Sequence, residues 1–290
     1  MDKLLLIICP FVAGMLLRRS GKFRESHALH ITNYVLNFSL PCLTIATISK
    51  LDLKGNHLEV AFIAWAVMMT GAILAYGTGM LLKLKDGRLR SFILVATFPN
   101  TAFLGYPLSY AAYGSSGLVY AMIYDQMGMF PFFLTLGFFV AGGKKSIGSA
   151  LKFPPFIALL FALLINMAGL SLPSQVTIVL KWIGWTTLPI TIFLIGLRIA
   201  FKRTQNFGCI TVALALRMII IPALVLIVLA VMGRKGLPFD VTFMESAMPP
   251  AMTTSILAAK YKLDEDLAVE AISAGTIICM IIYALFLLFR

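Results

Sequence analysis

Residues 97–107, TFPNTAFLGYP, decide the fold, because they interrupt a helix inside an apolar stretch. The surrounding residues 91–124 carry no charged side chain, which predicts one or two membrane helices. Pro99 nevertheless lacks a backbone N–H, and Asn100 and Thr101 after it are poor residues for a helix interior. In hydrocarbon an unpaired backbone group costs several kcal/mol, so protein or a water-filled cavity must receive the freed groups. The stretch therefore predicts a membrane helix that is broken near its middle.

The composition places the chain among polytopic integral membrane proteins. Of its 290 residues, 60% are hydrophobic and 12% are charged, and the mean hydropathy is +0.94. The net charge of +12 comes from basic residues in short loops, which indicates a topology signal and no nucleic-acid partner. The four cysteines stand singly among apolar residues and favour neither a metal site nor a disulfide.

Charged residues divide the chain into ten apolar segments, most of them long enough to cross a membrane as a helix. The predicted spans are 4–17, 29–49, 58–82, 91–113, 117–141, 153–172, 176–197, 208–232, 240–259 and 267–289. No cleavable signal peptide is evident at the start.

The loops differ strongly in basic residues. The odd-numbered loops hold sixteen Lys and Arg residues, and the opposite side with the termini holds seven. The positive-inside rule then places the odd loops in the cytoplasm. We therefore expect a multi-pass protein of the cytoplasmic (inner) membrane with both termini outside.

Two proline-marked helices recur along the chain. Pro41 in helix 2 is followed by Pro189 in helix 7 after 148 residues, and Pro99 in helix 4 by Pro249 in helix 9 after 150 residues. The repetition divides the chain into 1–145 and 146–290. Each half has five helices, so the second copy enters the membrane inverted. The prediction is an all-α fold of two inverted five-helix repeats with broken, crossing helices 4 and 9, which is typical of secondary transporters.

The predicted crossing indicates a site for an anion. Each half-helix that restarts there carries about half a positive charge at its N-terminus. Asn100 and Thr101 stand where helix 4 restarts, suited to capping and to ligand binding. In helix 9, Pro250 suits a first helical position, and Thr253 follows as a polar group. The alternative is that these prolines only kink the two helices, and that Ser and Thr side chains hydrogen-bond the backbone groups that the kinks leave free.

Ionisable residues within predicted spans are the next candidates. Asp125 in helix 5 could take up a proton and couple transport, or could pair with Arg217 in helix 8 as a structural acid. Arg217 could attract an anion, pair with Asp125 or extend to the interface, and pairing or extension is favoured. Glu245, near the outer end of helix 9, is expected to face water.

The blocks NYVLNFSLPCLTIATI, FPNTAFLGYPL and SAMPPAMTTSILAAKYKLDEDLAVEAI resemble the auxin efflux carrier family, in particular its compact prokaryotic branch, which is related to bacterial malonate transporters. The resemblance spans essentially the whole chain. It implies a scaffold of helices 1, 2, 6 and 7, which often dimerises, and a transport domain of helices 3–5 and 8–10 that moves in an elevator-like way. It also implies an organic-anion substrate, bound by Pro99, Asn100 and Pro249, with Tyr124 and Gln126 nearby. Ala102 replaces a glycine that many relatives have.

Together these features predict a carrier of small organic anions, auxin-like or malonate-like. Asn100 and Thr101 would hold the carboxylate, and Tyr124, Asp125 and Gln126 would form the pocket wall. We expect no metal and no cofactor, with coupling to protons or to the membrane potential left open. No nucleotide-binding or catalytic motif argues for a pump or an enzyme. The alternative is a membrane sensor or channel-like protein without carboxylate transport.

Overall fold

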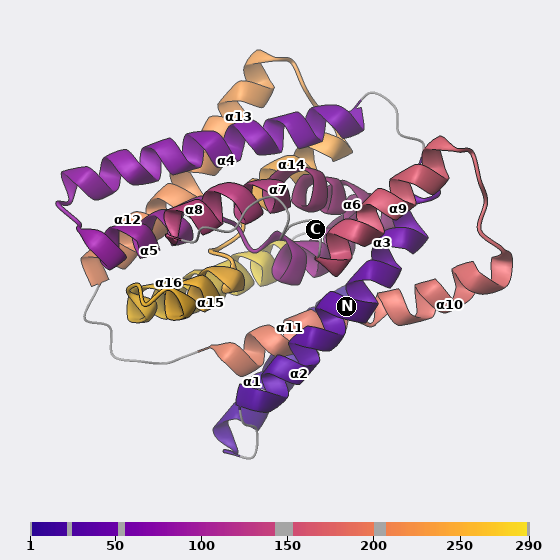
Figure 1. The fold of residues 1–290 in the computed structure, drawn as a ribbon, viewed down its shortest axis with the longest axis horizontal. Helices are drawn as coiled ribbons and strands as arrows, with labels where there is room; N and C mark the ends of the chain where they lie inside the picture. The colour runs from indigo at the N-terminus through magenta and orange to yellow at the C-terminus, as the bar shows by residue number, and fades with distance from the viewer. Residues whose placement is uncertain (1, 22–24, 52–55, 143–152, 200–206, 289–290) are drawn as a thin grey trace.

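The computed structural model describes residues 2–21, 25–51, 56–142, 153–199 and 207–288, and every regular element within them is a helix (Figure 1). The predicted boundary between the halves, at 145/146, lies outside these residues.

Most membrane-crossing segments combine several helical elements. The N-terminal half contains α1 (Asp2–Arg19), α2 (Glu25–Tyr34), η1 (Val35–Ser39), α3 (Leu40–Ile48), α4 (Asn56–Leu81), α5 (Asp86–Thr97), η2 (Thr101–Gly105), α6 (Tyr106–Ile123), η3 (Tyr124–Met129), α7 (Phe130–Phe132), η4 (Phe133–Gly137) and α8 (Phe138–Val140). The C-terminal half contains α9 (Pro154–Met167), α10 (Ser174–Trp185), α11 (Thr187–Arg198), α12 (Phe207–Ala215), η6 (Leu216–Ile220), α13 (Ile221–Val231), α14 (Leu237–Ser246), α15 (Met252–Lys260) and α16 (Glu265–Leu288).

Six helices of the described chain are long and apolar enough to cross a membrane. They are Ser26–Ile48, Asn56–Leu81, Thr101–Val140, Ser174–Arg198, Phe207–Val231 and Glu265–Phe286. Thr101–Val140 has 40 residues and turns sharply at Gly114. Here φ is +69°, a backbone conformation that glycine adopts more readily than other residues. The protein is therefore a multi-pass, all-helical membrane protein.

Four of the wide π-helical segments have a common sequence cause. η1, η2, η3 and η6 each end two residues before a proline, at Pro41, Pro107, Pro131 and Pro222. Proline lacks the N–H and clashes with the preceding turn, so the turn before it widens. Widened turns displace side chains from a regular helix surface, which matters below because η2, η3 and η6 carry residues of the candidate site.

Close backbone contacts between sequence-distant helices assemble the molecule. α1 packs along α11, while α9 and α10 pack along α3. Gly14 of α1 lies against the backbone of Phe193 and Leu197, and Gly196 of α11 lies against that of Phe11. Any larger residue at either glycine would separate the two helices.

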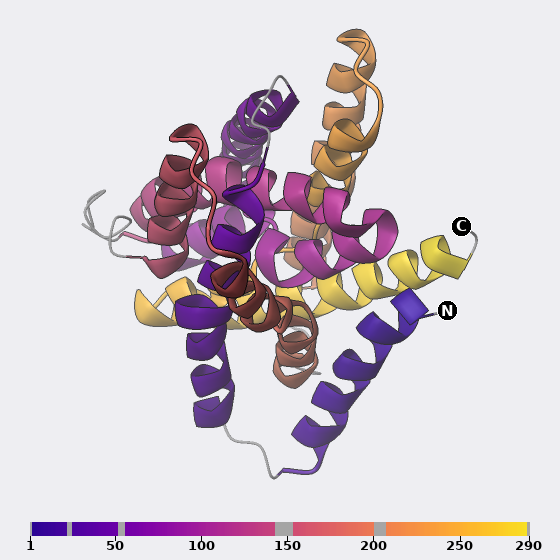
Figure 2. The same ribbon diagram turned by 90° about the vertical axis from the view of Figure 1, so that its right-hand side faces the viewer.

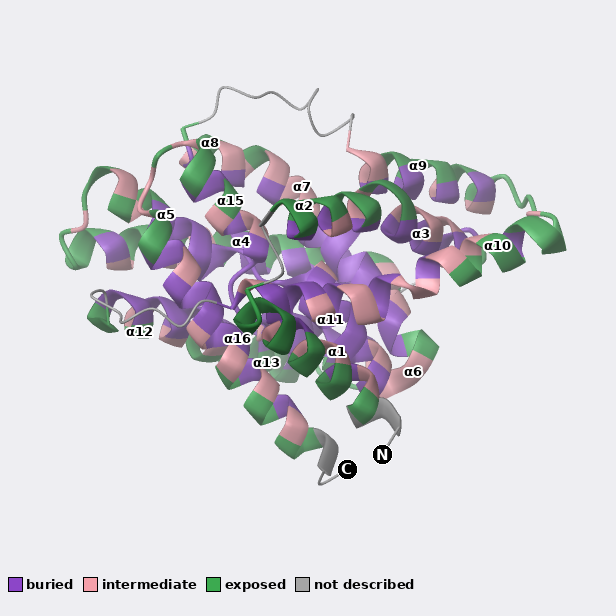
Figure 3. Ribbon diagram, turned by 90° about the horizontal axis from the view of Figure 1, so that it is seen from below, coloured by how far each residue is buried: buried purple, intermediate pink, exposed green. Residues whose placement is uncertain are grey.

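Buried residues gather in the middle of the molecule, where α5, η2, η3, η6 and α14 meet, and exposed residues line the outer helices (Figure 3). The start of α1 and the end of α16 lie on the same side (Figures 2 and 3). The described part of the chain thus surrounds a buried centre with a largely apolar exterior, as expected in lipid.

Candidate functional site

The two predicted helix breaks are present. α5 ends at Thr97, and the next helix begins at Thr101. α14 ends at Ser246, and α15 begins at Met252. Both interruptions lie in the buried centre, so the freed backbone groups require partners inside the protein.

The two linkers supply these partners for each other. The Asn100 N–H donates to the Pro249 carbonyl at 2.8 Å, and the Ala251 N–H donates to the Phe98 carbonyl at 2.8 Å. Pro99 therefore faces Pro250 in an isolated antiparallel bridge. Proline suits the middle of this bridge because its missing N–H is not needed there. We call residues 98–100 and 247–251 the crossover.

Pro250 corrects one sequence-based expectation. It was expected at the first helical position of the second half-helix, but α15 begins two residues later, at Met252. The pairing with Pro99 holds Pro250 in the extended linker.

Asn100 occupies the N-cap position of the restarted helix, yet its side chain makes no capping hydrogen bond. The residue is 3% exposed, and its amide Nδ2 has no hydrogen-bond partner. The expected capping role is therefore wrong in this conformation. A buried donor without an acceptor is costly, so a ligand acceptor at this point would be favourable.

Asn100 lines a cavity of about 310 Å³ at the crossover. The lining combines a few polar side chains with phenylalanines of several helices. The lining consists of Leu36, Leu40, Pro99, Asn100, Thr101, Ala102, Phe103, Asp125, Gln126, Met129, Phe130, Phe133, Leu134, Phe138, Phe153, Pro155, Phe156, Ala251, Met252, Thr253 and Lys260. Its size and its few convergent polar groups are typical of small-molecule sites.

The structure brings most of the sequence-predicted site residues to this cavity. Those that line it are Pro99, Asn100, Thr101, Asp125, Gln126 and Thr253. Those that do not are Tyr124, Pro249, Pro250 and Arg217. Pro249 and Pro250 act on the cavity indirectly, through the crossover backbone.

Asp125 accepts hydrogen bonds from two hydroxyl groups at the cavity wall. Thr101 Oγ1 lies 2.5 Å from one carboxyl oxygen and Tyr106 Oη lies 2.6 Å from the other. Its neighbour Gln126 donates to Thr44 Oγ1 at 2.8 Å and to Tyr106 Oη at 3.3 Å. Asp125 thus joins the start of the restarted helix to η3.

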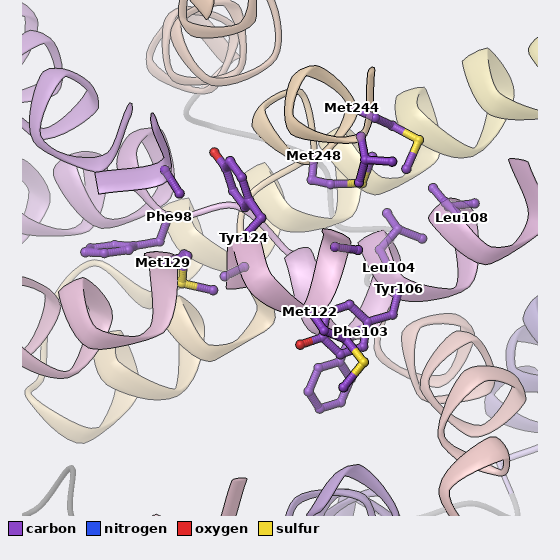
Figure 4. Close-up of a cluster of buried hydrophobic side chains, with 14 of the residues drawn as sticks. Phe98, Phe103, Leu104, Tyr106, Leu108, Met122, Tyr124, Met129, Met244 and Met248 are labelled. Carbon is purple, nitrogen blue, oxygen red and sulfur yellow. The ribbon is translucent and has the colours of Figure 1, made fainter. Parts of the chain in front are cut away.

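Tyr124 packs into the core beside this network. It is fully buried, and its hydroxyl group has no hydrogen-bond partner. Figure 4 shows the hydroxyl groups of Tyr124 and Tyr106 pointing away from each other. Tyr106 and not Tyr124 therefore provides the aromatic hydroxyl that contacts Asp125.

Arg217 corrects a second expectation. It was expected to extend to the interface or to pair with Asp125, but its side chain is 0% exposed. Its Nη1 donates to the Thr97 carbonyl at 2.7 Å, and its Nη2 donates to the Ser246 carbonyl. These are the last residues of α5 and α14. The π-helical turn η6 places the guanidinium against both helix ends.

Glu245 was expected to face water and is instead completely buried. α14 begins at Leu237, so Glu245 lies more than two turns inside the helix. Ser109 donates to its Oε1 at 2.7 Å, while Oε2 lies beside Gly105 and has no hydrogen-bond partner. Its burial in an apolar helix was not readable from the sequence. Among the described residues, no cluster of three His, Cys, Asp or Glu side chains is suited to a metal.

Comparison with known proteins indicates a membrane transport protein. The model of a family described as membrane transport protein matches residues 1–148 and 138–287. A relative from Methanocaldococcus jannaschii is 31% identical over 98% of this chain and 97% of its own length, and is called an uncharacterized transporter. Another from Methanothermobacter thermautotrophicus is 29% identical over 97% of this chain and 95% of its own, with the same description. The uncharacterized transporter YfdV of Escherichia coli is 23% identical over 90% of this chain and 88% of its own.

A multi-pass helical protein with a largely apolar cavity that holds a few polar side chains at paired helix breaks has the features of a membrane transporter. The chain belongs to the membrane transport protein family, which confirms the resemblance to the auxin efflux carriers.

Proposed function

We propose that this protein is a secondary carrier of small organic anions that works by alternating access at the crossover. The observation that carries the proposal is the buried, unpartnered Asn100 amide, which faces the cavity at the start of a helix. A carboxylate there would accept the Asn100 hydrogen bond and meet the positive end of the helix dipole.

The proposed topology is ten membrane passes in two inverted repeats, 1–145 and 146–290. Pairs of equivalent contacts support it. Ala251 lies 151 positions after Asn100, and Pro249 lies 151 positions after Phe98. Exchanging the members of each pair turns the hydrogen bond from Asn100 to Pro249 into the hydrogen bond from Ala251 to Phe98. The double match of the family model also supports two related halves.

A second pair of contacts supports the same symmetry at the outer helices. Arg18 donates to the Leu197 carbonyl at 2.7 Å, and Asn166 donates to the carbonyls of Ile48, Ser49 and Leu51 at 3.1, 3.3 and 2.5 Å. Arg18 and Asn166 are 148 positions apart, as are Ser49 and Leu197. Equivalent donors at the ends of α1 and α9 thus hold equivalent segments.

An elevator motion needs an interface that can slide. In the proposal α1–α3 and α9–α11 form the scaffold, and α4–α8 and α12–α16 form the transport domain. Aromatic pairs cross this boundary, with Phe130 stacked on Phe153 at 4.6 Å and Tyr110 against Trp185 at 4.7 Å between ring centroids. The Gln126–Thr44 hydrogen bond is a polar contact that crosses it. Apolar contacts are non-directional, so such a boundary tolerates displacement.

The lining of the cavity favours carboxylates with an apolar body over malonate-like dianions. Six phenylalanines, at positions 103, 130, 133, 138, 153 and 156, border it. A second carboxylate placed among these rings and away from Lys260 would lose its hydration without gaining a charged partner. Aromatic or branched monocarboxylates therefore fit the proposed site better.

The cavity adjoins the side that the loop charges assign to the cytoplasm. Phe138 lies near the end of helix 5, Phe153 near the start of helix 6 and Lys260 at the end of α15, all beside odd-numbered loops. We infer an inward-facing conformation in which Lys260 attracts anions to the opening. Asp125 remains the candidate for proton coupling, and a homodimer through the scaffold remains a prediction from the family.

The proposal is tested by uptake into proteoliposomes of phenylacetate, phenylmalonate and malonate, each with and without an imposed pH gradient or membrane potential. We expect saturable uptake of phenylacetate that exceeds that of malonate. Binding of a carboxylate without any flux would favour the sensor, and flux that does not saturate would favour the channel.

A further inference from the structure

Arg217 holds an unusual position for a buried cation. Both of its guanidinium Nη atoms donate to main-chain carbonyls, at Thr97 and at Ser246, and its Nε has no hydrogen-bond partner. Among the described residues, no acidic side chain forms an ion pair with it. An unpaired charge is costly to bury, so its interaction with the two helix ends must offset a large desolvation cost.

The charges at the crossover can be counted from the helix ends. Each N-terminus contributes about half a positive charge and each C-terminus about half a negative charge. The helices that begin at Thr101 and Met252 present two N-termini, and α5 and α14 present two C-termini. The four partial charges cancel, so the helix ends alone give the crossover no net charge.

Arg217 changes this balance by one full charge. Its guanidinium lies against the two C-termini and offsets their combined negative charge. The positive N-termini at Thr101 and Met252 are then no longer opposed. The buried carboxyl groups of this region are those of Asp125 and Glu245. When either is ionised it balances this charge, and when both are protonated a substrate carboxylate can do so.

We propose that Arg217 is a specificity-determining residue that makes the crossover prefer an anion over a neutral analogue of the same shape. The inference rests on the proposed function, because it concerns the same cavity. Arg217 acts through the crossover without touching the ligand, since it does not line the cavity.

The size of the effect follows from chain geometry. Thr97 lies three residues before Asn100, so their Cα atoms are at most about 11 Å apart. With an effective dielectric constant of about 20, a unit charge at about 10 Å changes the affinity for a monoanion about ten- to twentyfold. A neutral ligand is unaffected to first order.

The test compares two ligands that share a phenyl body, phenylacetate and its neutral amide phenylacetamide. Binding to the purified protein in nanodiscs is measured by isothermal titration for the wild type, Arg217→Met and Arg217→Lys. We expect the wild type to prefer phenylacetate, Arg217→Met to lower that preference about tenfold, and Arg217→Lys to keep it within about threefold. Thermal unfolding of each variant reports separately on the structural role.

The proposal is overturned if Arg217→Met keeps the wild-type preference for phenylacetate. It is also overturned if both variants lose affinity equally for the two ligands, which a purely structural role of Arg217 predicts. If Arg217→Met does not fold, Arg217→Gln replaces it, because this variant also removes the charge: a lowered preference for phenylacetate supports the proposal and the wild-type preference overturns it. A wild type that binds neither ligand removes the carboxylate function and the inference together. A wild type that prefers phenylacetate, with Arg217→Met unchanged, removes the inference alone.

Discussion

The Gln126 side-chain amide donates a hydrogen bond of 2.8 Å to Thr44 Oγ1, which joins the cavity wall on η3 to α3. Both residues are buried, so solvent does not replace this bond when it breaks. In an elevator motion the bond exists in one conformation only, and it therefore stabilises that conformation relative to the other.

Thr44→Val removes the acceptor with little change of shape. We expect the inward-facing conformation to lose about 1 kcal/mol, which shifts its population roughly fivefold. The measurement is the labelling rate of a cysteine at position 253, by an impermeant thiol reagent applied from the cytoplasmic side, in a background without the native cysteines. Thr135→Val is the matched control, because both threonine hydroxyls also donate to a carbonyl four residues earlier. Equal labelling in the two variants would argue against a state-specific bond.

Asn100→Ala removes the unpartnered donor at the crossover. A hydrogen bond to a charged group is worth about 1.5–3 kcal/mol, so carboxylate affinity should fall about ten- to a hundredfold. The thermal stability should stay close to the wild type, because the side chain makes no capping bond. Binding of phenylacetate is compared with that of Asn37→Ala, an exposed asparagine on η1. Unchanged affinity in Asn100→Ala would remove the residue on which the site depends.

Asp125→Asn tests the proton hypothesis. If a proton on Asp125 accompanies each substrate anion, an imposed pH gradient drives wild-type uptake, and the asparagine variant loses this response while keeping the size and shape of the side chain. Uptake is measured with the membrane potential clamped, and the exposed Asp240→Asn on α14 is the control. A pH response that survives in Asp125→Asn would assign the coupling elsewhere or to the substrate itself.

Gly128 permits the close approach of η3 to α4. A Cβ at this position would overlap the Ala64 methyl group. Gly128→Ala should therefore cost about 1–3 kcal/mol of stability, and Ala64→Gly in the same chain should restore much of it. Gly77→Ala on α4, the helix that carries Ala64, meets open space and should be neutral or slightly stabilising. The measurement is the melting temperature of each variant in detergent. A double variant that is no more stable than Gly128→Ala would contradict the contact between Gly128 and Ala64.

The crossover was predictable because proline marks it. Pro99 and Pro249 cannot continue a helix, and hydrocarbon allows such breaks only where protein receives the freed groups. The pairing partner followed from the repeated spacing and not from any local signal. The predicted position of Pro250, at the start of a helix, was wrong because the length of the bridge depends on both linkers together.

The surroundings of Arg217 and Glu245 were not predictable from the sequence. Hydropathy places a residue along a membrane helix, but a helix that is apolar on all sides does not show which face turns inward. The partners of Arg217 are main-chain carbonyls, which every residue has. The widened turn η6 shifts Arg217 away from the direction that regular helical spacing would give.

The reciprocal hydrogen bonds of the crossover also bear on how such a chain could originate. Residues 1–145 alone would leave the Asn100 N–H and the Phe98 carbonyl without their partners, and the carbonyl end of α5 without Arg217. Residues 146–290 alone would leave the Ala251 N–H and the Pro249 carbonyl without their partners, while the carbonyl end of α14 would keep Arg217. If the proposed inverted repeat arose by duplication of one gene, the subunit that this gene produced would have met these groups only as an antiparallel pair. Gene fusion would then have preserved an association that was already obligatory.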